Sequence, residues 1–437
     1  MKIKETIIRL MGLIALLALA GCSDDAEQRQ QRLQMEAVAS APGYMEAEAE
    51  ARGSMEEGYH EARGTRAWVP PTIPTQYYLY DVLYSGSLYA NYKSLNNMAI
   101  DVFFTHTGEG GLTTSPNPLH ARLRYVPAAP PAVSKWKLVL PNPVTEEDVK
   151  AGSYYVYGFI PRNAADGATI TGNPTFDEGA VLTIEGLQSI TADACVIIGA
   201  KEGFSADYDG DYTDTNDNDA YDDGTDIRTN RLTAGDFKFK LKTGESANNY
   251  MYLLFDHLCS ALDIRMRVYK DYDDLRTIKL KELHLQTATD EGKTKKKMNV
   301  TVTLKKTADG GDPIKSVVYE PTGEEECDGI VYQDEEGTRL STDYSMFLCH
   351  FIPHGTKKLI LTSTYDVYDK NVTLEHPEGN LIRANCKATN TIDITKKIDR
   401  LKEVKRGYKY TINMTIQPTY LYMLSEPDLD SPTVTVE

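Results

Sequence analysis

Short runs in which apolar and polar residues alternate recur along this chain, and they constrain its fold more than any other feature. The clearest is Leu262-Asp263-Ile264-Arg265-Met266-Arg267-Val268, where every second residue is apolar. A period of two is typical of a strand with one buried face. Similar runs occupy residues 119–125, 135–140, 236–241, 278–285, 300–304, 347–351, 359–364 and 408–416. Many short strands separated by turns predict an all-β sandwich fold.

Other stretches are apolar throughout or change pattern. Residues 99–105, 154–160 and 195–199 lack alternation, so we expect strands buried on both faces, the second ending at Pro161. Residues 250–259 predict one helical turn at the start of a second domain. The last residues, 433–437, alternate like a strand whose partner the sequence does not specify.

The N-terminus has the pattern of a lipoprotein signal. Basic residues precede an apolar run over residues 7–20, which is shorter than the about 20 residues of a membrane-spanning helix. Leu19-Ala20-Gly21-Cys22 resembles a lipobox, so we expect residues 1–21 to be removed and Cys22 to be acylated. Acyl chains on Cys22 would anchor the protein to the outer membrane. An ordinary secretory signal with a chance cysteine is the alternative.

A polar segment separates this signal from the globular part. Residues 22–66 are rich in Glu, Gln, Ala and Arg and predict a disordered or weakly helical tether, in which only residues 33–38 alternate like a strand. Aromatic residues and prolines appear abruptly after Arg66. We therefore expect one β-sandwich domain over residues 67–246 and a second over residues 247–437.

The net charge limits the classes of binding partner, and the cysteine count limits the possible disulfides. The formal net charge of -17 argues against nucleic acid, because phosphate backbones are bound through clustered Lys and Arg. Of six cysteines, five remain once Cys22 is lipidated, and an odd number leaves at least one thiol unpaired. We expect Cys195 and Cys349 to be buried free thiols.

Two clusters invite a metal assignment. Asp207, Asp209 and Asp211 surround a glycine and could bind calcium, although the spacing does not match an EF-hand and a solvated loop is the alternative. Cys349 and His350 fit no zinc spacing, and alternation places Cys349 in the core with His350 on the opposite face. We predict no other cofactor. His257 lies among apolar residues and is expected to be packed and hydrogen-bonded.

Enzyme motifs are missing from the sequence. Gly-x-Ser-x-Gly, His-Glu-x-x-His and a Gly-rich phosphate loop do not occur. The absence of these motifs lowers the expectation of catalysis. It does not exclude a glycosidase, because glycosidase carboxylates need no local motif. We predict that the protein is not an enzyme.

Several stretches together resemble the fimbrillin family of Bacteroidetes, the subunits of type V pili. They are the lipobox at Cys22, Thr65-Arg66-Ala67-Trp68, and residues 100–105, 154–161, 253–262 and 407–411. The resemblance implies two transthyretin-like β-sandwich domains in tandem. It also implies that an arginine-specific protease cuts after Arg66, leaving Ala67 as the new N-terminus. Loss of the first strand would then admit a strand from a neighbouring subunit, with Val434 and Val436, or residues 420–424, as the donor.

We therefore predict a structural, adhesive fimbrial subunit at the cell surface. Its expected partners are other fimbrial subunits, the protease, the outer membrane, and a host or bacterial surface ligand. Residues 33–38 lie far from the cut and prolines interrupt the tail, so an accessory or tip subunit is also open. The alternative function is a non-polymerising, glycan-binding surface lipoprotein in which Trp68, Trp136 or Tyr77-Tyr78 stack on sugar rings.

Overall fold

The expected all-β sandwich is confirmed. The computed structural model describes residues 34–42, 45–47, 76–78, 99–106, 118–126, 135–173, 179–202, 235–244, 248–306, 312–394, 404–417 and 433–436. Helical structure in these ranges is short: the 3-10 turns η4 (Glu146–Asp148) and η5 (Arg162–Ala164) and the helix α5 (Lys270–Asp273). Over the same ranges, no helix has the length and apolar character needed to cross a membrane.

The first sheet has nine strands and closes on itself. Its order is β11-β13-β1-β6-β5-β4-β7-β12, β3 lies beside β1, and β11 also pairs with β7. The strands are β1 (Gln34–Pro42), β3 (Gln76–Tyr78), β4 (Ala99–His106), β5 (Leu119–Val126), β6 (Lys135–Val139), β7 (Gly152–Ile160), β11 (Cys195–Glu202), β12 (Lys238–Leu241) and β13 (Asn248–His257). One core cluster, with members from β1, β4 to β7, β11, β12 and β13, fills the inside of this sheet.

A second sheet covers part of the first. It consists of β17 (Ile314–Glu326), β16 (Lys295–Leu304), β9 (Gly179–Gln188) and β8 (Gly167–Asn173), in that order. Alternate residues of β16, including Met298, Val300 and Val302, join Tyr157 and Phe159 of β7 in a second core cluster. Residues 154–160 are buried throughout, as the sequence predicted, because both faces of β7 are covered.

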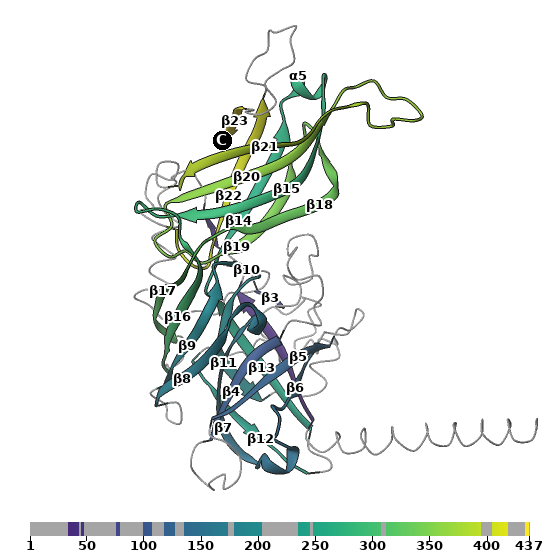
Figure 1. Cartoon of the computed structure of the whole chain (residues 1–437). Coiled ribbons are helices and arrows are strands. Elements are labelled where there is room, and N and C mark those ends of the chain that lie inside the picture. Colours follow the sequence, from purple (N-terminus) through teal and green to yellow (C-terminus); the bar gives the residue numbers. More distant parts are fainter. Residues whose placement is uncertain are drawn as a thin grey trace, which may run out of the picture.

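Two further sheets form a sandwich in the upper part of Figure 1. One contains β10 (Ile190–Thr191), β19 (Ser345–Phe351), β14 (Ser260–Val268), β22 (Tyr408–Gln417), β2 (Met45–Ala47) and β23 (Thr433–Val436). The other contains β18 (Gly329–Leu340), β15 (Thr277–Ala288), β20 (Lys358–Tyr368) and β21 (Leu381–Asp393). The third core cluster lies between them and includes Leu262, Ile264, Met266 and Val268.

Two expectations from the sequence are wrong. Residues 250–259 form no helical turn: most of them belong to β13, where apolar side chains alternate between the first and second core clusters. The segment upstream of Arg66 is not simply a tether, because residues 34–42 form an internal strand of the first sheet.

Strands from both sides of the predicted boundary between residues 246 and 247 pair with each other. β9 pairs with β16, and β11 pairs with β13. The division into two domains at that position stays a prediction.

Candidate functional site

The strand β1 occupies a position between two strands from distant parts of the chain. It runs parallel to β13, with Gln34 to Ser40 in register with Asn248 to Leu254. On its other side it runs antiparallel to β6, where Glu36 pairs with Lys137 and Ala37 with Trp136. In Figure 1 it is the purple strand in the lower part of the molecule. We call the position between β13 and β6 the β1 position.

One face of β1 is completely buried. Met35, Ala37, Ala39 and Ala41 have exposed fractions between 0% and 3% and belong to the first core cluster. Larger side chains surround them in that cluster, including Trp136 from β6 and Leu253 from β13. The strand thus contributes both backbone pairing and core packing, and its removal would leave two unpaired edges and an open core.

The opposite face of β1 carries a charged contact. Glu36 is half-buried and its Oε1 lies 3.5 Å from Nζ of Lys137. Because the lysine is largely exposed, this ion pair contributes little to stability. Attachment of β1 therefore depends on its backbone register and its buried face.

The N-terminal segment also pairs with the sheet that contains β14 and β22. Two residues after β1 ends, β2 begins and pairs in parallel with β22, Met45 to Ala47 against Tyr408 to Tyr410. Further along β22, Met414 to Gln417 pair with β23. β14 occupies the other side of β22, so β2 and β23 cover different halves of one edge. The partner of the C-terminal strand, which the sequence left open, is β22.

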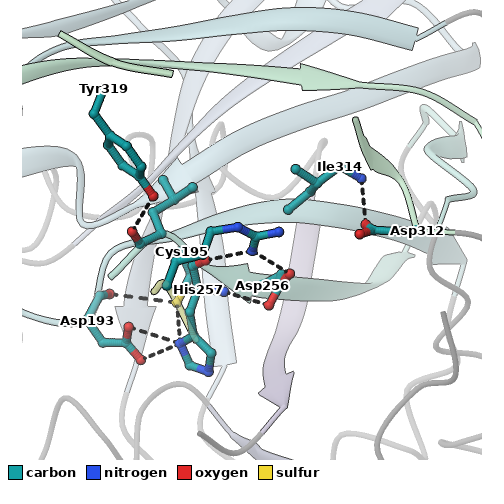
Figure 2. Close-up of polar contacts among 9 residues, drawn as sticks. Asp193, Cys195, Asp256, His257, Asp312, Ile314 and Tyr319 are labelled. Carbon is teal, nitrogen blue, oxygen red and sulfur yellow. Dashed lines mark hydrogen bonds and ion pairs between the residues drawn. The ribbon is translucent and has the colours of Figure 1, made fainter. Parts of the chain in front are cut away.

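A buried polar cluster lies where the chain passes from β13 to β14, and Figure 2 shows its contacts. Nδ1 of His257 is 3.0 Å from both carboxylate oxygens of Asp193 and 3.4 Å from Sγ of Cys195. The three residues are essentially inaccessible, with exposed fractions of 0% to 1%. This confirms the expectation of a packed, hydrogen-bonded His257.

The cluster contains the residue types of a cysteine nucleophile with a histidine base, but its environment opposes that chemistry. Burial, followed by the nearby Asp193 carboxylate, raises the pKa of the Cys195 thiol well above its ordinary value. Reactive cysteines need a lowered pKa and access to solvent. In this conformation the thiol is protonated and buried, so it lacks both features of a reactive cysteine.

Within the described ranges, Asp193, Cys195 and His257 are also the group with metal-ligand spacing, their ligand atoms lying within 4.8 Å of one another. Structural zinc sites use four ligands. Cys349 is buried in the core as expected. His350 does point to the other face, but it is buried as well, and that burial lowers its pKa to about 4.

An ion pair connects this cluster to β22. Nη1 of Arg406 donates to Oδ2 of Asp256 at 2.9 Å and to the carbonyl oxygen of His257 at 3.1 Å. Tyr319 of β17 donates its hydroxyl to the carbonyl oxygen of Leu258. The turn from β13 to β14 is therefore fixed by residues from two other strands or their flanks.

Most predicted site residues lie outside the described residues. These are Cys22, Arg66, Ala67, Asp207, Asp209 and Asp211. Trp136, one of the aromatic residues considered for sugar stacking, is described and is buried beneath the first sheet, so it offers no platform for a glycan. All five described cysteines are free and buried, including Cys195 and Cys349 as predicted.

Neither the buried polar cluster nor the full length of β1 is apparent from local sequence patterns. Asp193, Cys195 and His257 are brought together only by the pairing of β11 with β13, and no local spacing reveals that. β1 has three alanines on its buried face, which weakens its apolar pattern. The alternation over residues 33–38 indicates this strand, which extends beyond that run to Pro42.

No family model and no curated protein matches this chain. Solved structures do. A candidate cell adhesion protein from Bacteroides uniformis is 12% identical with a TM-score of 0.33, the match covering 93% of this chain and 98% of that one. One from Bacteroides fragilis is 9% identical with a TM-score of 0.38, covering 93% and 97%. The fimbrial anchor protein Mfa2 from Porphyromonas gingivalis is 10% identical with a TM-score of 0.22, covering 92% and 95%. With such low TM-scores, the functional argument rests on the geometry of this chain.

Proposed function

We propose that this protein is a fimbrial subunit of the cell surface that is activated by proteolysis and assembled by strand exchange. An arginine-specific protease cuts after Arg66, and Ala67 becomes the N-terminus. Departure of the upstream segment opens the β1 position, and a strand from a neighbouring subunit enters it. The same proposal makes the protein a structural and adhesive component rather than an enzyme.

The observation that carries this proposal is the placement of β1. It lies upstream of Arg66 in the sequence, yet it is an internal strand with a fully buried face. A cut between residues 47 and 76 separates β1 and β2 from the rest of the described chain. An exposed pair of strand edges above an apolar core is the kind of site that takes up an added strand.

The C-terminal strand is the first candidate donor. Among the described strands, Thr433–Val436 pairs with β22 alone, through four residues. A short strand at the border of a sheet has unpaired backbone groups on its other side and detaches more readily than a strand within the sheet. Its proposed destination is the β1 position of another subunit.

The proposed location follows from the lipobox. Acylation of Cys22 would attach the precursor to the outer membrane, and the polar segment before β1 would extend the globular part outward. A Cys22→Ser variant should lose incorporation of labelled palmitate while the same chain with Ser23→Ala retains it. Retention of label by the Cys22→Ser variant would remove Cys22 as the anchor.

The deciding experiment is limited digestion of the purified precursor with an arginine-specific protease, followed by N-terminal sequencing and electron microscopy. We expect a stable fragment that begins at Ala67 and then forms filaments or denaturant-resistant oligomers. Arg66→Lys should block the cut, whereas Arg63→Lys, three residues away, should leave it unchanged.

Other outcomes have distinct meanings. A fragment that begins at Ala67 but stays monomeric points to a tip or accessory subunit that needs a different partner. The absence of a discrete cut at Arg66 would exclude the processing model. Binding of glycans by the uncut protein would then make the monomeric surface lipoprotein the leading function.

A further inference from the structure

The β1 position is occupied by a strand whose inward side chains are mostly small. A large residue, Met35, comes first, and the next three inward residues are alanines, all completely buried. Ala37 lies opposite Trp136 on β6 and Met251 on β13, and Ala39 lies opposite Leu253. Large neighbours therefore fill the space that the alanines leave, and additional carbons at these positions would overpack a dense core.

The same pattern occurs a second time, immediately downstream. Residues 35–41 read Met-Glu-Ala-Val-Ala-Ser-Ala, and residues 45–51 read Met-Glu-Ala-Glu-Ala-Glu-Ala. The methionine, the first glutamate and all three alanines recur at an offset of ten residues. The C-terminal stretches do not repeat this pattern: residues 420–424 contain no small residue at either parity, and residues 433–436 contain no alanine, so a donor from either stretch would need the core around the β1 position to repack.

We propose that residues 45–51 are a second occupant of the β1 position, reached when the N-terminal segment slides by ten residues. In the shifted register Met45 replaces Met35, and Ala47, Ala49 and Ala51 replace the three alanines. Glu46 takes the place of Glu36 and can reach Lys137, which already pairs with Glu36. Backbone pairing with β13 and β6 is preserved, because sliding changes the residues and not the strand direction.

The outward residues explain why the observed register is preferred. Val38 is in register with Tyr252, and Ser40 with Leu254, and both partners on β13 are buried. The shifted register would put Glu48 and Glu50 at these places, and a carboxylate beside buried side chains is unfavourable. The second occupant is therefore weaker. It also draws β2 away from β22, since Met45 to Ala47 cannot pair with both.

Sliding by ten residues sets the direction in which the N-terminal segment leaves the β1 position. When the segment is pulled toward its N-terminus, residues 35–41 leave and residues 45–51 arrive, so the core is covered during the first step. The sliding itself requires no cut and does not depend on the proposed proteolysis. If the protein is processed as proposed, the same two steps would precede full opening.

Disulfide trapping tests the shifted register in the full chain. Glu36 is in register with Tyr250, so Glu36→Cys with Tyr250→Cys reports the observed register. Glu46→Cys with Tyr250→Cys forms a bond only after a slide of ten residues. In the chain that carries Glu46→Cys and Tyr250→Cys, a further Ala39→Leu should overpack the observed register. We expect it to raise the cross-linked fraction at least tenfold, as measured by mass spectrometry of peptides.

The matched control is Ala49→Leu, which places the same large residue in the second occupant. Adding it to Ala39→Leu should abolish the shifted cross-link and lower the yield of folded protein. Alone, it should leave the observed register unchanged. The proposal is overturned if Ala39→Leu gives no shifted cross-link, or if the single and double variants lose folded protein equally. Both results are independent of whether Arg66 is cleaved.

Discussion

Among single residues, the ion pair between Arg406 and the buried Asp256 is expected to contribute to the free energy of unfolding. Asp256 is almost fully buried, and the guanidinium supplies its opposite charge. Arg406→Met would remove the guanidinium from this buried carboxylate, and loss of one partner of a buried pair costs about 3–5 kcal/mol. We expect the urea unfolding midpoint to fall accordingly.

The control for this prediction is a pair of similar length in solvent. Lys270 Nζ lies 2.8 Å from Oδ2 of Asp274, and both side chains are exposed. Lys270→Met should not shift the unfolding midpoint measurably, because exposed pairs are hydrated and screened. A shift for Arg406→Met no larger than this one would contradict the assigned role.

The burial of His350 predicts that the free energy of unfolding depends on pH. Burial is the main cause that lowers its pKa to about 4, and the neighbouring His257 acts in the same direction while Asp193 opposes both. In the unfolded chain a histidine has a pKa of about 6.5. Between these values the unfolded chain binds a proton that the folded protein does not. Stability is therefore fully present above about pH 6.5 and falls as the pH drops, by about 3 kcal/mol in total from this residue.

The measurement is the free energy of unfolding between pH 7 and pH 4.5 for the natural chain and for His350→Gln. We expect the variant to show a shallower loss over that range, whatever its stability at neutral pH. The surface residue His376 provides a control, since His376→Gln should keep the full slope. Equal slopes for all three chains would show that His350 does not titrate as described.

At the scale of elements, alternation predicted most strands and failed where the environment is unusual. Strands with one buried face, such as β14 and β16, were found correctly, because solvent on the other face produces the period of two. β13 was misread as helical because it contacts two cores, so consecutive apolar residues replace alternation. β1 was underestimated because its buried positions hold alanine, which sequence patterns weigh lightly.

The C-terminal strand β23 provides an element-scale prediction. Removal of residues 433–437 should leave the pairing of β22 with β14 on its other side in place. It should expose the edge of β22 from Met414 to Gln417. We expect amide hydrogen exchange in that part of β22 to accelerate at least tenfold, with a tendency to self-associate through the open edge. A chain that lacks only Glu437 should exchange normally, and unchanged protection in the longer truncation would mean that β23 does not cover this edge.

At the scale of the whole molecule, the N-terminal segment connects two sheets that otherwise have separate cores. β1 is an internal strand of the first sheet, and β2 lies at the border of the sheet that contains β22. Only residues 43 and 44 lie between the two strands. Full release of the segment would therefore open the first sheet and half of one edge of β22 at the same time. Arg66 follows both β1 and β2 in the sequence, so a cut after it detaches both strands together.

This coupling is measurable by hydrogen exchange after cleavage. We expect the protein cut after Arg66, in urea below the unfolding transition, to lose amide protection in residues 248–254 of β13 and in residues 408–410 of β22 with the same time course. The Arg66→Lys variant, treated identically, should keep both. If β13 opens while β22 stays protected, β2 is held independently of β1. A shared time course would mean that one proteolytic event changes both parts of the molecule, which is what a subunit needs if assembly is to wait for processing.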